Sequence, residues 1–306
     1  MSDSNHRHRG RPRPRPPTLF GYDVVAEIGE GAGSLIYSVT DPTTGQPLAL
    51  KHVVRQTDKQ LRFVEQLQAE FEVASKVRHE GLRRCFALKY SRSLLFKINE
   101  AALIMELVEG RPLEWELPPT TIGIIDVFVQ TAKALEGLHA MGYVHCDLKP
   151  SNILVSPTGL TKVIDLGQAC KVGTAKKRIQ GTPDYIAPEQ VKCLPVTVKT
   201  DVFNFGATLY WSLCGRKLPT LYNIRKSENS FLLDTTIAGP RECNKQVPET
   251  LSNLVMECVR TNPQKRPADM AELSRRLEII LHVMRKEQAA AAAVPPSGLR
   301  RNFQVA

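Results

Sequence analysis

The feature that most constrains this chain is a short polar loop held between two apolar segments. Residues 143–155 read Tyr-Val-His-Cys-Asp-Leu-Lys-Pro-Ser-Asn-Ile-Leu-Val, so His145, Asp147, Lys149 and Asn152 fall within eight residues. A loop between buried segments is where a rigid scaffold commonly presents catalytic groups. A carboxylate there can accept a hydroxyl proton, a cation can neutralise a phosphate and an amide oxygen can ligate Mg²⁺. Ten residues after Val155, Asp165 adds a second carboxylate.

A glycine-rich stretch lies near the amino terminus. Residues 28–37 read Ile-Gly-Glu-Gly-Ala-Gly-Ser-Leu-Ile-Tyr, with strand-forming residues on both sides. Glycine lets backbone N–H groups approach phosphate oxygens closely, because no Cβ atom interferes. The pattern therefore predicts a hairpin that can cover a nucleotide, although a glycine-rich turn alone is a weak signal.

A lysine follows inside an apolar segment. Lys51 stands in Pro47–Val54, where a buried ammonium would be costly unless it were paired, although an alternating strand could also point it to solvent. Apolar residues at three- and four-residue spacing then predict an amphipathic helix over residues 58–78. Three carboxylates of that helix are candidate partners for the lysine: Glu65, Glu70 and Glu72.

The second half of the chain carries further motifs. Helical periodicity over residues 122–141 ends at Gly142, directly before the polar loop. Residues 181–189 read Gly-Thr-Pro-Asp-Tyr-Ile-Ala-Pro-Glu, Asp201 begins an apolar helix, and residues 262–267 read Asn-Pro-Gln-Lys-Arg-Pro. Each motif alone could be a surface turn, so its meaning depends on the order in which all of them occur.

In this order, the motifs over residues of about 20–284 resemble those of eukaryotic-like serine/threonine protein kinases of the kind found in bacteria. The resemblance implies an α+β, bilobal fold. A small β-rich amino-terminal lobe with one main helix would span about 18–106, followed by a hinge at about 106–110. A larger, mostly α-helical lobe would span 111–287.

The resemblance also implies a reaction, in which the γ-phosphoryl group of Mg-ATP passes to a Ser or Thr hydroxyl of a protein substrate. Mn²⁺ could replace Mg²⁺. Asp147 would be the catalytic base, Lys149 would neutralise the γ-phosphate, and Asn152 and Asp165 would hold the metal, whereas His145 is expected to be structural. The residues expected to contact ATP are Ile28, Gly29, Gly31, Gly33, Ser34, Ile36, Ala49, Lys51, Glu70, Met105, Glu106 and Val108.

Individual positions within these motifs carry more specific expectations from the resemblance. Glu70 becomes the preferred partner of Lys51, because similar kinases place this Glu nine residues before a His, here His79. Met105 would be the gatekeeper, and backbone groups near Glu106–Val108 would bind adenine. In the larger lobe, three further contacts are implied: Thr182 with Asp147 and Lys149, Glu189 with Arg266, and Asp201 with the catalytic-loop backbone.

Several positions depart from the usual kinase pattern. Ser34 replaces the third Gly and Ile36 replaces a Val of the glycine-rich loop, and Leu166 stands where Phe is commoner. Cys146 stands where many kinases have an Arg that binds a phosphate on the activation loop. The residue four before Thr182, which often carries that phosphate, is Arg178. We therefore expect activity without phosphorylation at that position.

Composition limits the other possibilities. The 306 residues are 42% hydrophobic and include no apolar run near 18 residues, so no membrane segment is expected. The seven Cys are scattered without a Cys-x-x-Cys pair, which favours a reducing cytoplasm over a disulfide framework or a zinc site. The net charge of +10 lies mostly in the tails, since residues 1–17 hold five Arg and one Asp, and Arg300 and Arg301 follow at the other end. Nucleic-acid binding is therefore not expected as the main function.

The tails themselves are expected to be disordered. Within residues 1–17, the segment 5–17 alternates Arg and Pro, and residues 288–306 begin with Gln and five Ala before Val-Pro-Pro. The basic amino-terminal tail could dock a partner, but a solvated linker is the simpler interpretation. Two alternatives, a binding module and a different enzyme, also stay open at this point. A nucleotide-responsive pseudokinase is suggested by Ser34 and Cys146, and a small-molecule kinase of related fold is disfavoured by the segment ending at Glu189.

Overall fold

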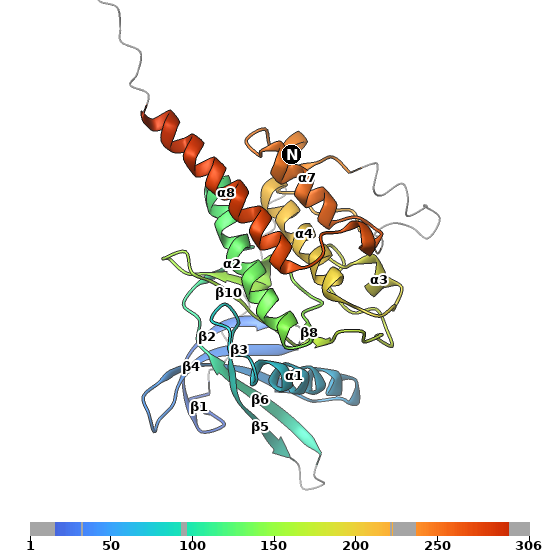
Figure 1. The fold of residues 1–306 in the computed structure, drawn as a ribbon. Coiled ribbons are helices and arrows are strands. Elements are labelled where there is room, and N and C mark those ends of the chain that lie inside the picture. Colours follow the sequence, from blue (N-terminus) through green and yellow to red (C-terminus); the bar gives the residue numbers. More distant parts are fainter. Residues whose placement is uncertain (1–15, 32, 93–96, 221, 223–236, 294–306) are drawn as a thin grey trace, which may run out of the picture. The chain divides into compact units, whose positions relative to one another are not determined.

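The computed structural model describes residues 16–31, 33–92, 97–220, 222 and 237–293 (Figure 1). The chain forms two compact units. Unit 1 takes its described residues from the segments up to Lys76 and from Arg84–Val108, and unit 2 takes them from Val77–Arg83 and from Glu109 onward. The division after Val108 falls inside the segment predicted as a link. Residues 1–15 and 294–306, which make up most of the two predicted tails, lie outside the described residues.

Unit 1 is a six-stranded antiparallel sheet with one main helix. The strand order is β1-β2-β3-β4-β6-β5. The strands are β1 (Thr18–Leu19), β2 (Tyr22–Gly31), β3 (Ser34–Thr40), β4 (Pro47–Val54), β5 (Cys85–Arg92) and β6 (Ile98–Glu106). A 3-10 turn, η1 (Asp58–Gln60), leads into α1 (Leu61–Ala74). Pro17 already belongs to this unit, because its carbonyl accepts a hydrogen bond from Val24 N, so the amino-terminal tail ends before the expected residue 17.

The helix α1 is amphipathic because its buried positions recur at helical spacing. Val64, Leu67, Glu70 and Val73 are buried, so a carboxylate lies within the otherwise apolar face. The helix ends at Ala74, four residues before the expected end at residue 78. The following segment, Val77–Arg83, belongs to unit 2 instead of the amino-terminal lobe that the sequence predicted. Arg83 N donates to Val163 O, which holds this segment to unit 2.

Unit 2 is mostly helical with two small sheets. Its helices are α2 (Thr121–Ala140), α3 (Pro188–Val191), α4 (Val198–Cys214), α6 (Pro240–Cys243), α7 (Glu249–Cys258) and α8 (Met270–Ala293). One sheet has the order β10-β9-β7 and the other pairs β11 with β8. These strands are β7 (Arg111–Pro112), β8 (Tyr143–Val144), β9 (Ile153–Val155), β10 (Thr161–Val163) and β11 (Cys170–Lys171), and two 3-10 turns are η2 (Pro150–Asn152) and η3 (Pro263–Lys265).

Local sequence explains where the central helices begin and end. Thr120 caps α2 by accepting from Gly123 N, and Thr197 caps α4 by accepting from Lys199 N. Gly215 closes α4 at a φ of 65°, which a glycine adopts without strain. Phe128 of α2 and Phe205 of α4 meet edge to face, with ring centroids 5.1 Å apart. The helices therefore form a packed base beneath the polar loop that follows β8.

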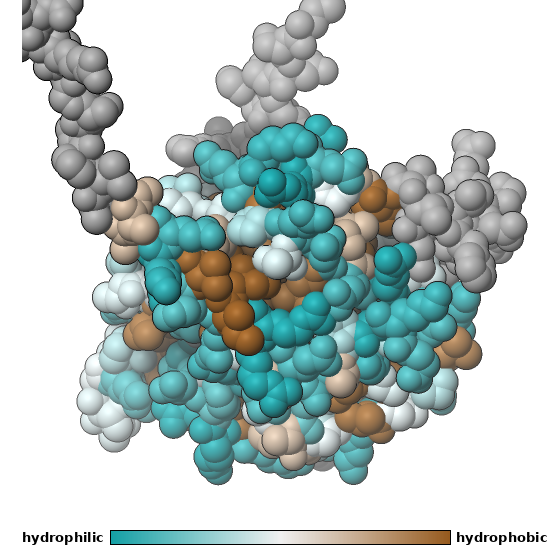
Figure 2. Space-filling model, turned by 45° about the horizontal axis from the view of Figure 1, so that its top comes forward, coloured by the Kyte–Doolittle hydropathy of each residue, from teal (hydrophilic) through white to brown (hydrophobic). Residues whose placement is uncertain are grey.

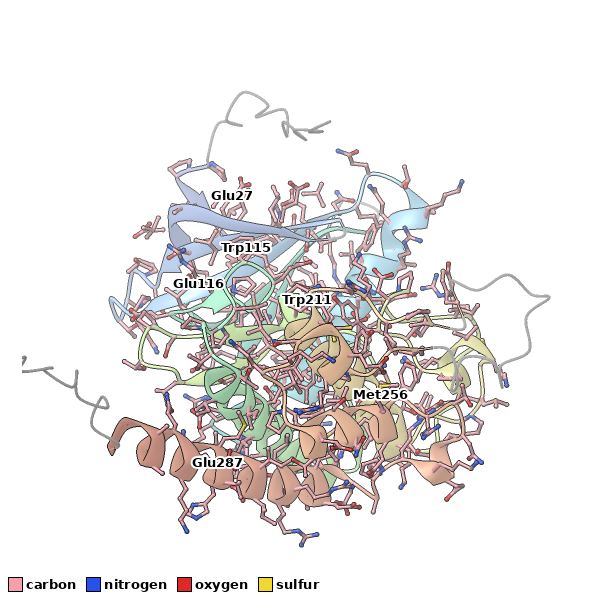
Figure 3. All side chains as sticks on the ribbon, turned by 90° about the horizontal axis from the view of Figure 1, so that it is seen from above. Glu27, Trp115, Glu116, Trp211, Met256 and Glu287 are labelled. Carbon is pink, nitrogen blue, oxygen red and sulfur yellow. The ribbon has the colours of Figure 1, made fainter. Side chains whose placement is uncertain are left out.

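The helix α8 is longer than the sequence predicted. It lies beside α2 and continues to Ala293, whereas the domain was expected to end at residue 287 (Figure 1). Alanine is the strongest helix former, so the run of five Ala extends the helix instead of fraying it at once. Figure 3 labels Glu287, the last residue before this extension, on α8, and Met256 on α7.

The surface is mostly polar on the face drawn in Figure 2, where separate apolar patches interrupt hydrophilic side chains. Exposed apolar residues of this kind are ordinary on globular proteins when they are scattered. Within the described ranges, we find no helix that is both long enough and apolar enough to cross a bilayer.

Candidate active site

The lysine of β4 and one carboxylate of α1 form a buried ion pair. Lys51 Nζ lies 2.8 Å from Glu70 Oε2, so the structure selects Glu70 among the three candidate carboxylates. The Glu70 side chain is 2% exposed, whereas that of Lys51 is 16% exposed. The carboxylate is thus held in the interior of unit 1, whereas the lysine side chain is partly exposed.

The glycine-rich stretch forms the predicted hairpin between β2 and β3. Gly31 pairs with Ser34 across the strands, and Gly29 pairs with Ile36. Ser34 is buried, and its hydroxyl lies 3.0 Å from where a Cβ atom on Gly31 would stand. The serine at the third glycine position therefore fills the space that Gly31 leaves. Ile28 lies at a register shift in β2 and is exposed, so it is not part of the core.

The end of β6 is built from buried neighbours on β4. Met105 is fully buried and pairs with Ala49, and Glu106 pairs with Leu48. Glu106 also binds back to Arg84, since its backbone N–H donates to the Arg84 carbonyl at 3.0 Å. The strand ends there, two residues before Val108, so the predicted gatekeeper and link residues follow one another at the end of unit 1.

The polar loop of unit 2 brings a carboxylate, an ammonium and a hydroxyl together. Thr182 Oγ1 donates to Asp147 Oδ1 at 2.8 Å and accepts from Lys149 Nζ at 3.1 Å. Lys149 Nζ is also 3.3 Å from Asp147 Oδ2. The predicted contact of Thr182 with both residues is therefore present. A carboxylate that already accepts a hydroxyl hydrogen bond beside a cation has the arrangement needed to orient a second hydroxyl.

The two predicted metal ligands have different local settings. Asn152 is buried, and its amide nitrogen donates to the Asp147 backbone carbonyl at 2.9 Å, which leaves its amide oxygen as the ligand atom. Asp165 has a φ of 63°, a left-handed conformation that is uncommon for a residue with a side chain. Its Oδ1 accepts from Gly167 N at 3.3 Å. Both residues offer oxygen atoms, as hard divalent cations require.

The backbone before Asp147 is fixed by one buried carboxylate. Asp201 accepts hydrogen bonds from His145 N at 2.7 Å and Cys146 N at 2.8 Å, which is the anchoring contact that the sequence predicted. A third bond, to His139 Nε2 at 2.8 Å, was not predicted. Burial disfavours the charged carboxylate, but the His139 hydrogen bond and the nearby His139 and His145 rings outweigh it, so the pKa of Asp201 is lowered.

His145 has a structural role in this arrangement. Its ring accepts from Asp147 N through Nδ1 at 3.2 Å, so its Nε2 carries the proton that faces Ile164 O at 3.3 Å. The fully buried ring thereby ties the residue of the proposed base to the segment just before Asp165. The geometry agrees with the expectation that His145 supports the loop and does not react.

A second buried ion pair lies farther along unit 2. Arg266 binds Glu189 through two parallel hydrogen bonds of 2.7 and 3.0 Å, as the sequence predicted. The sequence did not predict Thr200 as a further partner of Glu189, or Gln190 as a partner of the Cys146 backbone. Thr200 Oγ1 donates to Glu189 Oε1 at 2.9 Å, and Gln190 Nε2 donates to Cys146 O at 2.7 Å. No spacing rule identifies these partners, because they come from separate segments.

A pocket of about 730 Å³ opens elsewhere in unit 2, near the beginning of α2. Glu116, which is labelled in Figure 3, is one of its lining residues. Asp147, Lys149, Asn152 and Asp165 do not line it. The candidate active site is therefore the polar loop and not this pocket, because a reaction requires the reactive side chains and a cavity alone does not supply them.

Comparisons with known proteins identify the family. The family described as "Protein kinase domain" matches residues 22–277, so this chain belongs to the protein kinase domain family. A probable serine/threonine-protein kinase of Clostridium acetobutylicum is 26% identical over 260 residues, which cover 82% of this chain and 38% of that protein. The serine/threonine-protein kinase PknA of Mycobacterium tuberculosis is 32% identical over 210 residues, which cover 65% of this chain and 48% of PknA.

A third relative, the serine/threonine-protein kinase PknD of Chlamydia pneumoniae, is 26% identical over 288 residues, covering 84% of this chain and 31% of PknD. The chain thus spans less than half the length of each of these three relatives. The α+β fold expected from the sequence, with a β-rich first unit and a helical second unit, is confirmed.

Proposed function

We propose that this chain is an ATP-dependent serine/threonine protein kinase. The observation that carries the proposal is the contact of Asp147, Lys149 and Thr182 within unit 2. The Asp147 carboxylate and the Lys149 ammonium lie together there, and both bind the Thr182 hydroxyl. The backbone just before Asp147 is anchored by Asp201. The family match and the relatives named serine/threonine-protein kinases support the same activity.

In this mechanism Asp147 orients the acceptor hydroxyl and takes its proton as the new P–O bond forms, while the bond from the γ-phosphorus to the β–γ bridging oxygen breaks and ADP leaves. Lys149 lies beside it and supplies positive charge to the transferring phosphoryl group. In unit 1, Lys51 would contact the α- and β-phosphates while Glu70 holds the ammonium in place. The glycine-rich hairpin, Ala49, Met105 and the backbone at Glu106–Val108 would complete the contacts to ATP.

The proposed metal sites fit Mg²⁺ in their chemistry. Asn152 offers its amide oxygen because its nitrogen is already committed to the Asp147 carbonyl, and Asp165 offers a carboxylate. Mg²⁺ is commonly bound by one or two protein oxygens together with substrate phosphates, and Mn²⁺ accepts the same donors. Bound there, the ion would neutralise negative charge on the phosphates. Within the described residues, no cluster of three His, Cys, Asp or Glu suggests a different metal.

The acceptor is proposed to be Ser or Thr of a protein. Lys149 two residues after Asp147, and Thr182 in the Gly-Thr-Pro-Asp-Tyr segment, are the features that favour Ser/Thr over Tyr. We also propose a cytoplasmic location, since all seven cysteines are present as thiols, as is usual in reducing compartments. The basic tail predicted over residues 1–17 remains a proposed docking segment for an acidic partner or a Pro-binding domain.

The test compares the full chain with its Asp147→Asn variant in Mg²⁺-ATP with a generic basic protein as substrate. We expect phosphate transfer by the wild type and a fall of about 10²–10⁴-fold in the variant, because the base is lost. Asp126→Asn is a matched control, since Asp126 is an exposed partner of Arg285, and its activity should change less than about twofold.

ATP binding, followed separately by thermal shift, separates the alternatives. A wild-type chain that binds Mg²⁺-ATP but transfers no phosphate would be a nucleotide-responsive binding module and would refute the proposal. Transfer to small molecules alone would indicate a small-molecule kinase instead.

A further inference from the structure

Two cysteines from separate segments meet beside the proposed base. Cys146 directly precedes Asp147, and Cys170 begins β11, yet their sulfur atoms are only 3.9 Å apart. The two segments are paired strands, since Cys170 lies opposite Val144 and Lys171 lies opposite Tyr143 in the β11–β8 pair. Cys146 has a φ of 63°, an uncommon left-handed conformation for a residue with a side chain. The contact is therefore a property of the folded pair and not of sequence proximity.

The surroundings of the two thiols are unequal. Cys146 is buried with Val144 and Val196, and only 2% of its surface is exposed. Cys170 packs against the same cluster but is only half-buried, so a small solute can reach it. One cysteine is thus partly exposed, whereas the other is buried in an apolar setting.

The electrostatic setting separates the thiols further. The pKa of the Cys170 thiol falls to about 6, because the Cys146 S–H donates to it and the Lys176 ammonium and the Thr174 hydroxyl favour the thiolate against the opposing effect of burial. The pKa of Cys146 is raised by its hydrogen bond to Cys170, by burial and by the Asp201 carboxylate. A thiolate with a neutral thiol in contact is the arrangement of an attacking and a resolving cysteine.

We propose that Cys146 and Cys170 are a peroxide-sensitive pair whose reversible disulfide lowers phosphoryl transfer. The formation of the disulfide does not depend on the proposed kinase function, whereas its effect on catalysis rests on that function. Cys146 occupies the position at which many kinases have an arginine that binds a phosphate on the activation loop. In this chain the Cys146 thiol instead contacts Cys170 in β11, the strand that precedes that loop.

The oxidation proceeds in two balanced steps. The Cys170 thiolate attacks one oxygen of hydrogen peroxide, the O–O bond breaks, and the products are Cys170 sulfenic acid and hydroxide, which takes a proton to become water. The Cys146 sulfur then attacks the Cys170 sulfur, the S–O bond breaks, and the leaving hydroxide takes the Cys146 proton as a second water. Two thiols are oxidised and one peroxide is reduced, and a dithiol reductant reverses the change.

The disulfide should disturb the site because hydrogen bonds hold the backbone at Cys146, which therefore cannot shift freely toward Cys170. An S–S bond of about 2.05 Å requires the two sulfur atoms to move roughly 1.8 Å closer. Cys146 is fixed by its backbone, since Asp201 accepts from its N–H at 2.8 Å and Gln190 donates to its carbonyl at 2.7 Å. Much of the shift therefore falls on β11 and the segment that leads to Thr182, the partner of Asp147. Displacements near 1 Å in an active site can cost about a hundredfold in rate.

The test treats the full reduced chain with graded hydrogen peroxide, blocks the remaining thiols with an alkylating reagent and maps the peptides without reduction. We expect a peptide pair linked through Cys146 and Cys170, together with a loss of kinase activity of at least about tenfold. A dithiol should restore both. Cys170→Ser should lack the linked peptide and keep its activity in peroxide. Cys193→Ser is the matched control, because Cys193 is also half-buried and lies in the following segment, and it should respond as the wild type does.

The outcomes separate the two proposals. Oxidation of Cys170 to a sulfinic acid without a link to Cys146, or a link that forms only between other cysteines, would overturn the inference. A Cys146–Cys170 link that leaves kinase activity unchanged would overturn its regulatory part. If the reduced chain transfers no phosphate, the kinase proposal fails, but the peptide map still decides whether the disulfide forms.

Discussion

Two buried ion pairs in this molecule have similar chemistry and different surroundings. In unit 2, all five N–H groups of Arg266 are used, two on Glu189 and three on the carbonyls of Lys199, Arg260 and Thr261. In unit 1, Lys51 meets Glu70 at 2.8 Å, but its side chain remains 16% exposed, against 0% for Arg266. The arginine side chain of the first pair is closed to solvent, whereas the lysine side chain of the second pair is partly exposed.

This difference in exposure distinguishes an ion pair that only holds segments of the fold together from one whose cation is suited to bind a ligand. Arg266 has no remaining donor with which to hold a ligand, and its guanidinium also lies over the Phe203 ring at 5.0 Å. A buried ion pair of this kind fixes one arrangement of segments, here those carrying Glu189 and Arg266. An ammonium has three donors on a flexible stem, so the partly exposed Lys51 is better suited than the closed Arg266 to hold a ligand phosphate.

The largest expected effect is on folding. Arg266→Met should lower the free energy of unfolding by about 3–5 kcal/mol, because it leaves the Glu189 carboxylate buried without a counter-charge. Denaturant unfolding measures it. Arg276→Met is the control, since Arg276 and its two partners, Glu257 and Glu272, are 32–41% exposed, and the change should stay below about 1 kcal/mol. Equal losses in the two variants would show that burial does not distinguish these pairs.

The next effect is on catalysis. Lys51→Met should reduce phosphate transfer by about 10²–10³-fold, since it removes a cation aimed at the nucleotide phosphates. Its cost in unfolding free energy should be about 1.5–3 kcal/mol, below that of Arg266→Met, because loss of Arg266 also removes the donor to three backbone carbonyls.

A double variant sharpens the same comparison. Lys51→Met with Glu70→Leu should recover most of that stability, because no charge is left unpaired, and should recover none of the activity. If activity returned together with stability, Lys51 would be part of the scaffold like Arg266.

The smallest expected effect is a dependence on pH. The folded pKa of Asp201 lies below its unfolded value of about 3.9, so its contribution to stability is present above that value and is lost as the pH falls through the lowered folded pKa. At neutral pH, Asp201→Asn should cost about 1–3 kcal/mol, because the acceptor for the His145 and Cys146 N–H groups is weakened. Unfolding curves of both proteins should converge in acid. A gap that stays constant down to pH 2 would contradict the assignment.

Much of this site could be predicted from the sequence because its residues occur in motifs with fixed spacing. The contacts of Lys51 with Glu70, of Arg266 with Glu189, and of Thr182 with Asp147 and Lys149 are all present. Helical periodicity placed α1 and α2 to within a few residues. The roles of these residues in binding ATP and metal stay predictions.

Other features could not be predicted, because they depend on contacts between segments that no spacing rule relates. His139 binds Asp201, which lies 62 residues later in the chain. Cys146 contacts Cys170 because the two-residue strands β8 and β11 pair with each other. Ends of elements were also uncertain. α8 passes residue 287 because alanine favours helix, and Val77–Arg83 joins unit 2 because its hydrogen-bond partner, Val163, lies there.

The turn of the glycine-rich hairpin has one more consequence. A Cβ atom on Gly33 would stand 2.5 Å from the Phe63 ring of α1, and the φ of 77° would strain it in any case. Gly33 of the turn and Phe63 of the helix therefore occupy adjoining space, so a larger side chain at either position would clash with the residue now at the other. Among relatives, positions 33 and 63 should accordingly covary, with bulk at the turn appearing only where the helix carries a smaller residue.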